Sequence, residues 1–150
     1  MNKICTSIEQ SKKLIELGID VNTADMYYYY DHDWSNEHIE IPKIWDNNYE
    51  QFIPESEEDD IPAWSLTALI DLLPSEFTTE NDLGTFKYKI DIRKYKYTDE
   101  ENLYQIAYGS IKTDIDGQYS FKDMINTGEK ESLLDAVFEM IVLLKENNKL

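Results

Sequence analysis

The stretch "GTFKYKIDIRKYKY", residues 84–97, alternates between apolar and charged side chains. This two-residue period is typical of a β-strand with one buried face. The apolar positions are Phe86, Tyr88, Ile90 and Ile92, and the charged positions are Lys87, Lys89, Asp91 and Arg93. The alternation slips at Lys94, because Tyr95 and Tyr97 fall on the charged side. We therefore expect a β-bulge at Lys94.

The segments that follow predict more antiparallel strands. The turn "TDEEN" leads into "LYQIAYGSIK", in which Tyr104, Ile106 and Tyr108 share a face, so the two strands form a β-hairpin. The segment "DIDGQYSF", residues 114–121, predicts a short third strand after a turn at Asp116-Gly117.

Two segments nearer the N-terminus also favour strands. "MYYYY", residues 26–30, is a run of strong strand formers with two tyrosines on each face. "HIEIPKIW", residues 38–45, follows it, and Pro42 makes this segment an edge strand or the end of a strand.

Three helices are predicted, at about residues 7–17, 65–73 and 132–147. The first has Thr6 or Ser7 as its N-cap with Glu9 or Gln10 in capping-box spacing, and Gly18 ends it. Ser65 caps the second and Pro74 ends it, and Ser132 caps the third, which has only a narrow polar stripe. The order of elements predicts an α+β fold, in which an antiparallel sheet of four or five strands carries the three helices mainly on one face.

Length and composition indicate one domain, residues 1–150. Residues 46–60, "DNNYEQFIPESEEDD", hold seven acids and no base and show no periodicity, so we expect an acidic loop there. No apolar run is long enough for a signal peptide or a membrane span, and Cys5 is the one cysteine. We therefore expect a cytoplasmic protein with no disulfide, no cofactor and no contact with a membrane.

The net charge of −17 is concentrated in one part of the chain. Residues 14–86 carry one base and 18 acids, a net of −17, whereas residues 1–13 carry +2 and residues 87–150 carry −2. The negative electrostatic field of such a chain repels nucleic acid and attracts basic proteins or cations. Acidic side chains also keep a small protein soluble, which explains the same composition. We predict a protein partner rather than a nucleic acid, and a homodimer remains open.

A basic strip lies within the strand at 84–97. Its members are Lys87, Lys89, Arg93, Lys94 and Lys96, interleaved with Tyr88, Tyr95 and Tyr97. Aromatic and basic residues together can bind single-stranded nucleic acid, but the overall charge opposes this. A solvated strand face, or pairing with the acidic half of the same molecule or of a second copy, fits better.

A metal site has its only candidates near the end of the tyrosine run. They are Asp31, His32, Asp33 and His38, with Glu37 and Glu40 nearby. Carboxylates and imidazoles can hold a divalent ion, but neighbours in a strand fall on opposite faces, so Asp31 and Asp33 could converge without His32. A polar turn after an aromatic strand explains the same residues, and we predict no metal site. Cys5, just before the first helix, is expected to be a structural residue rather than a nucleophile.

Three blocks carry a resemblance to other proteins: "ICTSIEQSKKLIELGID" with the following "TADM", "IPAWSLTALIDLLP", and "DAVFEMIVLLKENNKL". Together they resemble an uncharacterised family of small proteins from phages and mobile elements of gut anaerobic bacteria. The resemblance covers about half of the chain and implies the setting of an accessory protein, with no catalytic or binding residue to carry over.

These observations favour a non-enzymatic protein that acts by protein–protein interaction, because tyrosine and tryptophan commonly anchor interfaces. The predicted interaction residues are Tyr27, Tyr28, Tyr29, Tyr30, Trp34, Trp45, Tyr49 and Phe52, with Glu57, Glu58, Asp59 and Asp60 as an acidic rim. Two alternatives stay open. One is an acidic mimic of nucleic acid that inhibits a host nucleic-acid-binding protein, and the other is a metal-dependent hydrolase that uses the Asp31-His32-Asp33 region.

Overall fold

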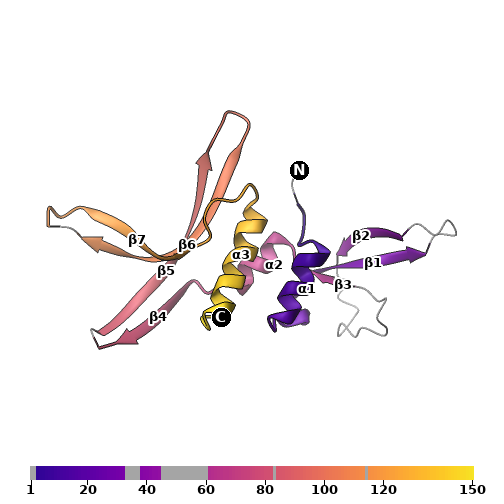
Figure 1. Ribbon diagram of the computed structural model, residues 1–150, viewed down its shortest axis with the longest axis horizontal. Coiled ribbons are helices and arrows are strands. Elements are labelled where there is room, and N and C mark those ends of the chain that lie inside the picture. Colours follow the sequence, from indigo (N-terminus) through magenta and orange to yellow (C-terminus); the bar gives the residue numbers. More distant parts are fainter. Residues whose placement is uncertain (1–2, 33–37, 45–60, 83, 114) are drawn as a thin grey trace. The chain divides into compact units, whose positions relative to one another are not determined.

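The computed structural model describes residues 3–32, 38–44, 61–82, 84–113 and 115–150 (Figure 1). Contacts divide the chain into two compact units, Met1–Leu72 and Leu73–Leu150. Within the described residues there are three α-helices and two antiparallel sheets, one sheet in each unit. The predicted α+β fold with antiparallel strands is confirmed, and whether residues 1–150 act as one domain stays a prediction. The predicted acidic loop at 46–60 lies outside the described residues.

Unit 1 contains a short sheet and two helices. Its elements are α1 (Ile8–Glu16), the 3₁₀ turn η1 (Val21–Thr23), β1 (Met26–His32), β2 (His38–Ile44), β3 (Ile61–Ala63) and α2 (Leu66–Leu72). The strand order is β2-β1-β3, and both pairs are antiparallel. The tyrosine run is therefore the central strand of this sheet.

The start of α1 follows from local sequence. Ser7 Oγ accepts the backbone N–H of Gln10 at 3.2 Å, and Gln10 Oε1 accepts the backbone N–H of Ser7 at 3.0 Å. This is the predicted capping box. Gly18 follows the helix with φ +80°, the left-handed conformation that glycine adopts at least cost.

A buried tryptophan holds unit 1 together. Trp64 is 0% exposed, its backbone N–H donates to Thr6 Oγ1 at 3.0 Å, and its carbonyl accepts the Thr6 N–H at 2.9 Å. The Thr6 hydroxyl also lies 2.8 Å from that of Ser11, which is equally buried, and the Trp64 indole N–H donates to Thr23 Oγ1 at 2.9 Å. The segment before α1 is thereby fixed to the segment between β3 and α2.

Unit 2 is built on a four-stranded antiparallel sheet. Its elements are β4 (Glu76–Asn81), β5 (Gly84–Lys96), β6 (Asn102–Thr113), β7 (Tyr119–Asn126) and α3 (Leu133–Glu146), with strand order β4-β5-β6-β7. The β5–β6 hairpin and the third strand β7 confirm the prediction. β4 was not predicted, because "EFTTEN" is short and polar with Phe77 as its one large apolar residue.

The predicted bulge at Lys94 is wrong. The β5–β6 register runs unbroken from Lys89↔Gly109 to Lys96↔Asn102. Tyr95 and Tyr97 interrupt the alternation because they are exposed, at 41% and 69%, rather than because the strand shifts. The irregularity lies between β6 and β7 instead, at Tyr108/Gly109.

The helix α3 packs against β6. Ser132 Oγ caps it by accepting the Asp135 backbone N–H at 3.4 Å, as predicted. Its fully or nearly fully buried residues are Leu134, Ala136, Val137, Met140, Ile141 and Leu144. On β6, Ile106 and Tyr108 are 0% exposed, and the Tyr108 hydroxyl donates to the Pro74 carbonyl at 2.5 Å. Burial of that hydroxyl raises the pKa of Tyr108.

Within the described part of the chain, no helix is both long enough and apolar enough to cross a bilayer.

Thr6→Val should lower the free energy of unfolding by about 1–3 kcal/mol, because a near-isosteric side chain without the hydroxyl leaves the buried Trp64 N–H unpaired. Thr6→Ser is the matched control, since it keeps the hydroxyl and loses only a methyl group, at about 1 kcal/mol. Urea unfolding followed by circular dichroism measures both. A valine variant no less stable than the serine variant would contradict the role given to the hydroxyl.

Candidate functional site

The four-stranded sheet of unit 2 has one face toward α3 and one open face. Successive residues of a strand alternate between faces, so Gln105, Ala107 and Gly109 lie on the side opposite Ile106 and Tyr108. Strand register extends this side to β5 and β7. We call this side of the sheet the open face. Its residues include Asp91, Arg93, Tyr95, Gln105, Ile111, Phe121 and Asp123.

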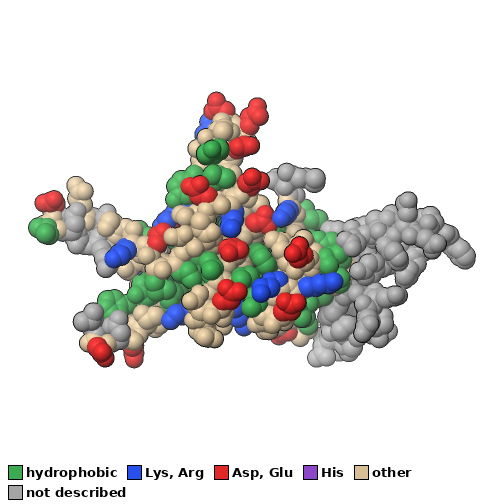
Figure 2. Space-filling model, viewed as in Figure 1, with side chains coloured by type: hydrophobic (Ala, Val, Ile, Leu, Met, Phe, Trp, Pro, Cys, Tyr) green, Lys and Arg blue, Asp and Glu red, His purple; other side chains and the backbone are tan. Residues whose placement is uncertain are grey.

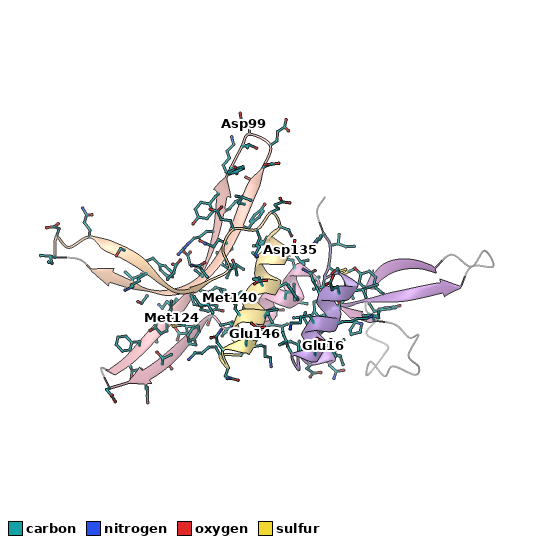
Figure 3. All side chains as sticks on the ribbon, viewed as in Figure 1. Glu16, Asp99, Met124, Asp135, Met140 and Glu146 are labelled. Carbon is teal, nitrogen blue, oxygen red and sulfur yellow. The ribbon has the colours of Figure 1, made fainter. Side chains whose placement is uncertain are left out.

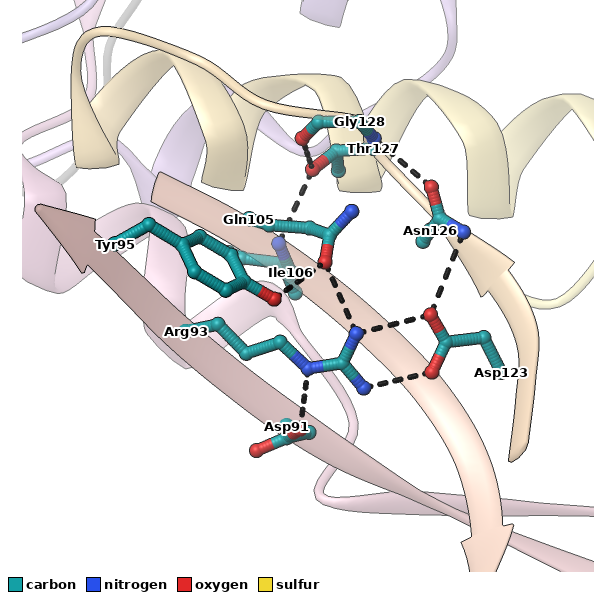
Figure 4. Close-up of polar contacts among 9 residues, drawn as sticks. All are labelled: Asp91, Arg93, Tyr95, Gln105, Ile106, Asp123, Asn126, Thr127 and Gly128. Carbon is teal, nitrogen blue, oxygen red and sulfur yellow. Dashed lines mark hydrogen bonds and ion pairs between the residues drawn. The ribbon is translucent and has the colours of Figure 1, made fainter. Parts of the chain in front are cut away.

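A charged network centred on Arg93 crosses the open face (Figure 4). The Arg93 guanidinium donates to both carboxylate oxygens of Asp123, at 2.7 and 2.9 Å, and Nε donates to Asp91 at 2.6 Å. A further N–H donates to Gln105 Oε1 at 3.0 Å, which also accepts the Tyr95 hydroxyl at 3.3 Å. One side chain of β5 is thus bonded to β6 and β7.

A β-bulge puts Asp123 within reach of Arg93. Tyr108 pairs with Ile125, but Gly109 pairs with Asp123, so Met124 is an extra residue in β7. If Met124 instead paired with Gly109 in a regular ladder, Asp123 would pair with Ser110, on the face toward α3, because a one-residue shift exchanges the faces. The bulge therefore moves both Asp123 and Phe121 to the open face.

Gly109 makes room for Phe121 beside this network. A Cβ at Gly109 would lie 2.5 Å from Phe121 Cε1 and closer still to the Lys122 carbonyl oxygen. The Phe121 ring occupies the space that a side chain would fill, and the Arg93 guanidinium carbon lies 5.2 Å from its centroid, in cation–π range. The open face thus carries a layered arrangement of glycine, aromatic ring and guanidinium.

The ion pair between Arg93 and Asp123 is partly shielded from solvent. The two side chains are 21% and 25% exposed. The hydrogen bonds from Arg93 hold the pKa of Asp123 below its usual range, and the bond to Asp123 in turn raises the pKa of Arg93. Both groups stay charged at neutral pH, so the network fixes the side chains around it rather than supplying an acid or a base.

The predicted basic strip is largely paired with acids of its own unit. Lys87 lies 3.3 Å from Glu76, and Lys96 lies 2.9 Å from Asp99, in addition to the bonds of Arg93. Acidic side chains, drawn in red in Figure 2, gather at the tip of the β5–β6 hairpin, where Figure 3 labels Asp99. Pairing within the same unit weakens the strip as a surface for nucleic acid.

Two of the predicted interaction residues have described side chains. Tyr28 is half-buried, packs against Cys5, Met26 and Ala63, and donates its hydroxyl to the Thr6 carbonyl at 2.9 Å. Tyr27 is also half-buried. At Tyr28 the tyrosine run serves the core of unit 1, and an interface role for these residues stays a prediction.

The other predicted site residues cannot be placed as side chains. Trp34, Trp45, Tyr49, Phe52, Glu57, Glu58, Asp59, Asp60 and Asp33 lie outside the described residues. The side chains of Tyr29, Tyr30, Asp31, His32 and His38 also lie outside the described part, although their backbones pair in the β1–β2 hairpin. In that hairpin His32 is directly opposite His38, a pairing that the sequence analysis missed.

Among the side chains that the structure describes, no group of three or more His, Cys, Asp or Glu residues is placed to hold a metal ion. Cys5 is 4% exposed, and burial raises the pKa of its thiol. The thiol lies 3.5 Å from the Tyr28 hydroxyl. A buried thiol with a raised pKa is poorly suited to be a nucleophile, in line with the structural role expected for Cys5.

Comparison with known proteins gives no relative: no family model, no curated protein and no solved structure matches the chain.

Asp123→Asn should lower the free energy of unfolding at pH 7 by about 1.5–3 kcal/mol, because it weakens a charge-assisted pair. The folded-state pKa of Asp123 is depressed, so its stabilisation is present above the unfolded value of about 3.9 and is lost as pH falls through the folded value. The difference from the wild type should therefore shrink below about pH 4. Urea unfolding at several pH values measures it.

The control for this prediction is Asp99→Asn, which removes an ion pair whose acid is 97% exposed. It should change stability little at any pH, because exposed pairs contribute little. If the loss of unfolding free energy in Asp123→Asn stays constant from pH 7 to pH 3, the carboxylate charge is not the source of that loss.

Proposed function

We propose that this chain is a non-enzymatic accessory protein, encoded by a phage or mobile element, that acts in the host cytoplasm by binding another protein. The observation that carries the proposal is the open face of unit 2. There, exposed apolar and aromatic side chains flank an arginine that its own unit already holds in place.

Tyr95 and Ile111 lie at the two ends of this surface. They are 41% and 68% exposed, and the Arg93 network and Phe121 lie between them. Tyr95 pairs with Leu103, so the strip follows β6 from Leu103 to Ile111, about 26 Å at roughly 3.3 Å per residue. That length suits an interface of ordinary size, which buries about 800 Å² on each partner.

The residue types of the strip also suit binding. Tyrosine and arginine are enriched among the residues that dominate interface energies. Arg93 is fixed by Asp91, Asp123 and Gln105 before any partner arrives, so little side-chain entropy remains to be lost on binding.

The partner we propose is a protein with a basic surface. The net charge of −17 attracts such a protein over distance and speeds its association. The exposed acids at the β5–β6 tip extend this field beyond the strip. A second copy of the chain carries the same negative charge and is therefore the less favoured occupant.

Tyr95→Ser combined with Ile111→Ser should reduce recovery of the partner at least tenfold, equivalent to about 1.4 kcal/mol of binding free energy. Affinity capture of the tagged protein from host lysate, quantified by mass spectrometry at low and high salt, measures this. The matched control is Ile4→Ser, which removes an isoleucine of unit 1 that is 62% exposed.

Equal recovery of the partner by the wild type and the double variant would contradict the proposed surface. Recovery that does not fall with salt would contradict a basic partner. Sedimentation of the purified chain tests whether the occupant of this surface is a second copy. If the wild type sediments as a dimer and the double variant as a monomer, the surface binds a second copy of the chain rather than a basic protein.

A further inference from the structure

The strand β5 continues past the end of its neighbour β4 (Figure 1). β5 has 13 residues, whereas β4 has 6 and pairs only with residues 84–89. Just beyond them, the Ile90 N–H donates to the Ser75 carbonyl at 3.1 Å. No strand of the described chain pairs with residues 91–96 on this side, although β6 pairs with them on the other. We call the unpaired side of residues 91–96 the free edge of β5.

The bond from Ile90 shows which backbone groups lie at the free edge. Within a strand, the N–H and C=O of one residue point to the same edge, and successive residues alternate between the two edges. Because Ile90 points toward β4, every second residue after it does so too. The outward N–H and C=O groups therefore belong to Ile92, Lys94 and Lys96, and the residues between them are paired with β6.

Two lysines give the free edge a positive charge. Lys94 and Lys96 are exposed and share the face of the sheet toward α3. The Lys94 ammonium lies 6.0 Å from the centroid of the Tyr104 ring, and Lys96 pairs with Asp99, which is 97% exposed. An exposed pair of this kind contributes little stability, so Lys96 can exchange Asp99 for another carboxylate at small cost.

The other face of the same segment is less polar. Tyr95 lies on the open face and is 41% exposed, next to Arg93, whose charge its own network already pairs. A strand added at the free edge would therefore have one face beside two lysines and the other beside a tyrosine. This arrangement suits an extended segment in which acidic and apolar residues alternate, because alternate residues of a strand lie on opposite faces.

We propose that the free edge of β5 binds an extended segment of another protein, with alternating acidic and apolar residues, as an added strand of the sheet. The backbone bonds supply affinity, and the acids opposite Lys94 and Lys96 supply selectivity. Residues 87–150 carry a net charge of −2 and oppose an acidic segment far less than the whole chain does. A second copy is less favoured, because two such edges would bring their lysines together. This site differs from the surface proposed above, since it uses the strand's backbone and takes an acidic partner.

Amide hydrogen exchange, measured by NMR on the full-length chain at neutral pH, tests the edge directly. The probe is a capped heptapeptide of alternating glutamate and valine. Saturating peptide should slow exchange of the amides of Ile92, Lys94 and Lys96 at least about tenfold. The Arg93 amide should not change, because it is already paired with β6. A heptapeptide of the same composition, with its glutamates in one block, should bind at least about tenfold more weakly.

Two variants at one position separate the backbone from the side chain. Lys94→Ala keeps the outward N–H and should weaken binding several-fold. Lys94→Pro also removes that N–H, which takes no part in the pairing with β6, and should weaken binding at least about tenfold further. Lys122→Ala, which removes an exposed lysine of β7, is the matched control and should bind as the wild type does. Circular dichroism checks that each variant is folded, and the exchange measurement on the wild type decides the proposal if Lys94→Pro does not fold.

Four outcomes would overturn the proposal or part of it. Unchanged exchange at millimolar peptide would overturn the site, as would equal binding of the two heptapeptides. Equal affinity of Lys94→Ala and Lys122→Ala would overturn the part given to the lysine, and equal affinity of Lys94→Pro and Lys94→Ala would overturn strand addition. If the Lys94 amide is already protected without peptide and the chain sediments as a dimer, the free edge binds a second copy instead.

Discussion

The ion pair between Arg93 and Asp123 depends on one extra residue in β7. Met124 has no partner on β6, and this bulge puts Asp123 on the face where Arg93 lies. The same shift places Phe121 over Gly109, where the ring meets the guanidinium. A single change of register therefore positions the acidic partner of Arg93 and the aromatic ring beside it, and gives unit 2 an ordered surface opposite α3.

Local sequence signals predicted most of the elements but not how they meet. The alternation at 84–97, the capping box at Ser7 and the polar stripe of α3 each act within a few residues, and the structure confirms them. The bulge was expected at Lys94 because an apolar residue was assumed to be buried, whereas Tyr95 is exposed. The true bulge escapes prediction because "FKDMI" reads as a regular strand, and only pairing with β6 shows that Met124 is extra.

The candidate sites differ in the same way. Tyr28 was predicted as an interface residue from its type, but its hydroxyl bonds to the Thr6 carbonyl and its ring packs against the core of unit 1. Arg93 was read as part of a basic strip, and its acidic partners come from both its own strand and β7, 30 residues away in sequence for Asp123. The pairing of His32 with His38 likewise required the register of β1 and β2. Residue type suggested chemistry in each case, and only contacts between distant parts of the chain show which residues each one lies beside.

Two single-residue deletions in β7 test most directly whether strand pairing organises the open face. Deletion of Met124 removes the extra residue and leaves Ile125 opposite Tyr108 and Asp123 opposite Gly109, so the Arg93–Asp123 pair is kept and urea unfolding should show a loss of no more than about 1 kcal/mol. Deletion of Lys122 would put Phe121 opposite Ser110, on the face toward α3, and should cost at least about 3 kcal/mol. If the two deletions lower stability equally, the assignment of Asp123 and Phe121 to the open face is contradicted.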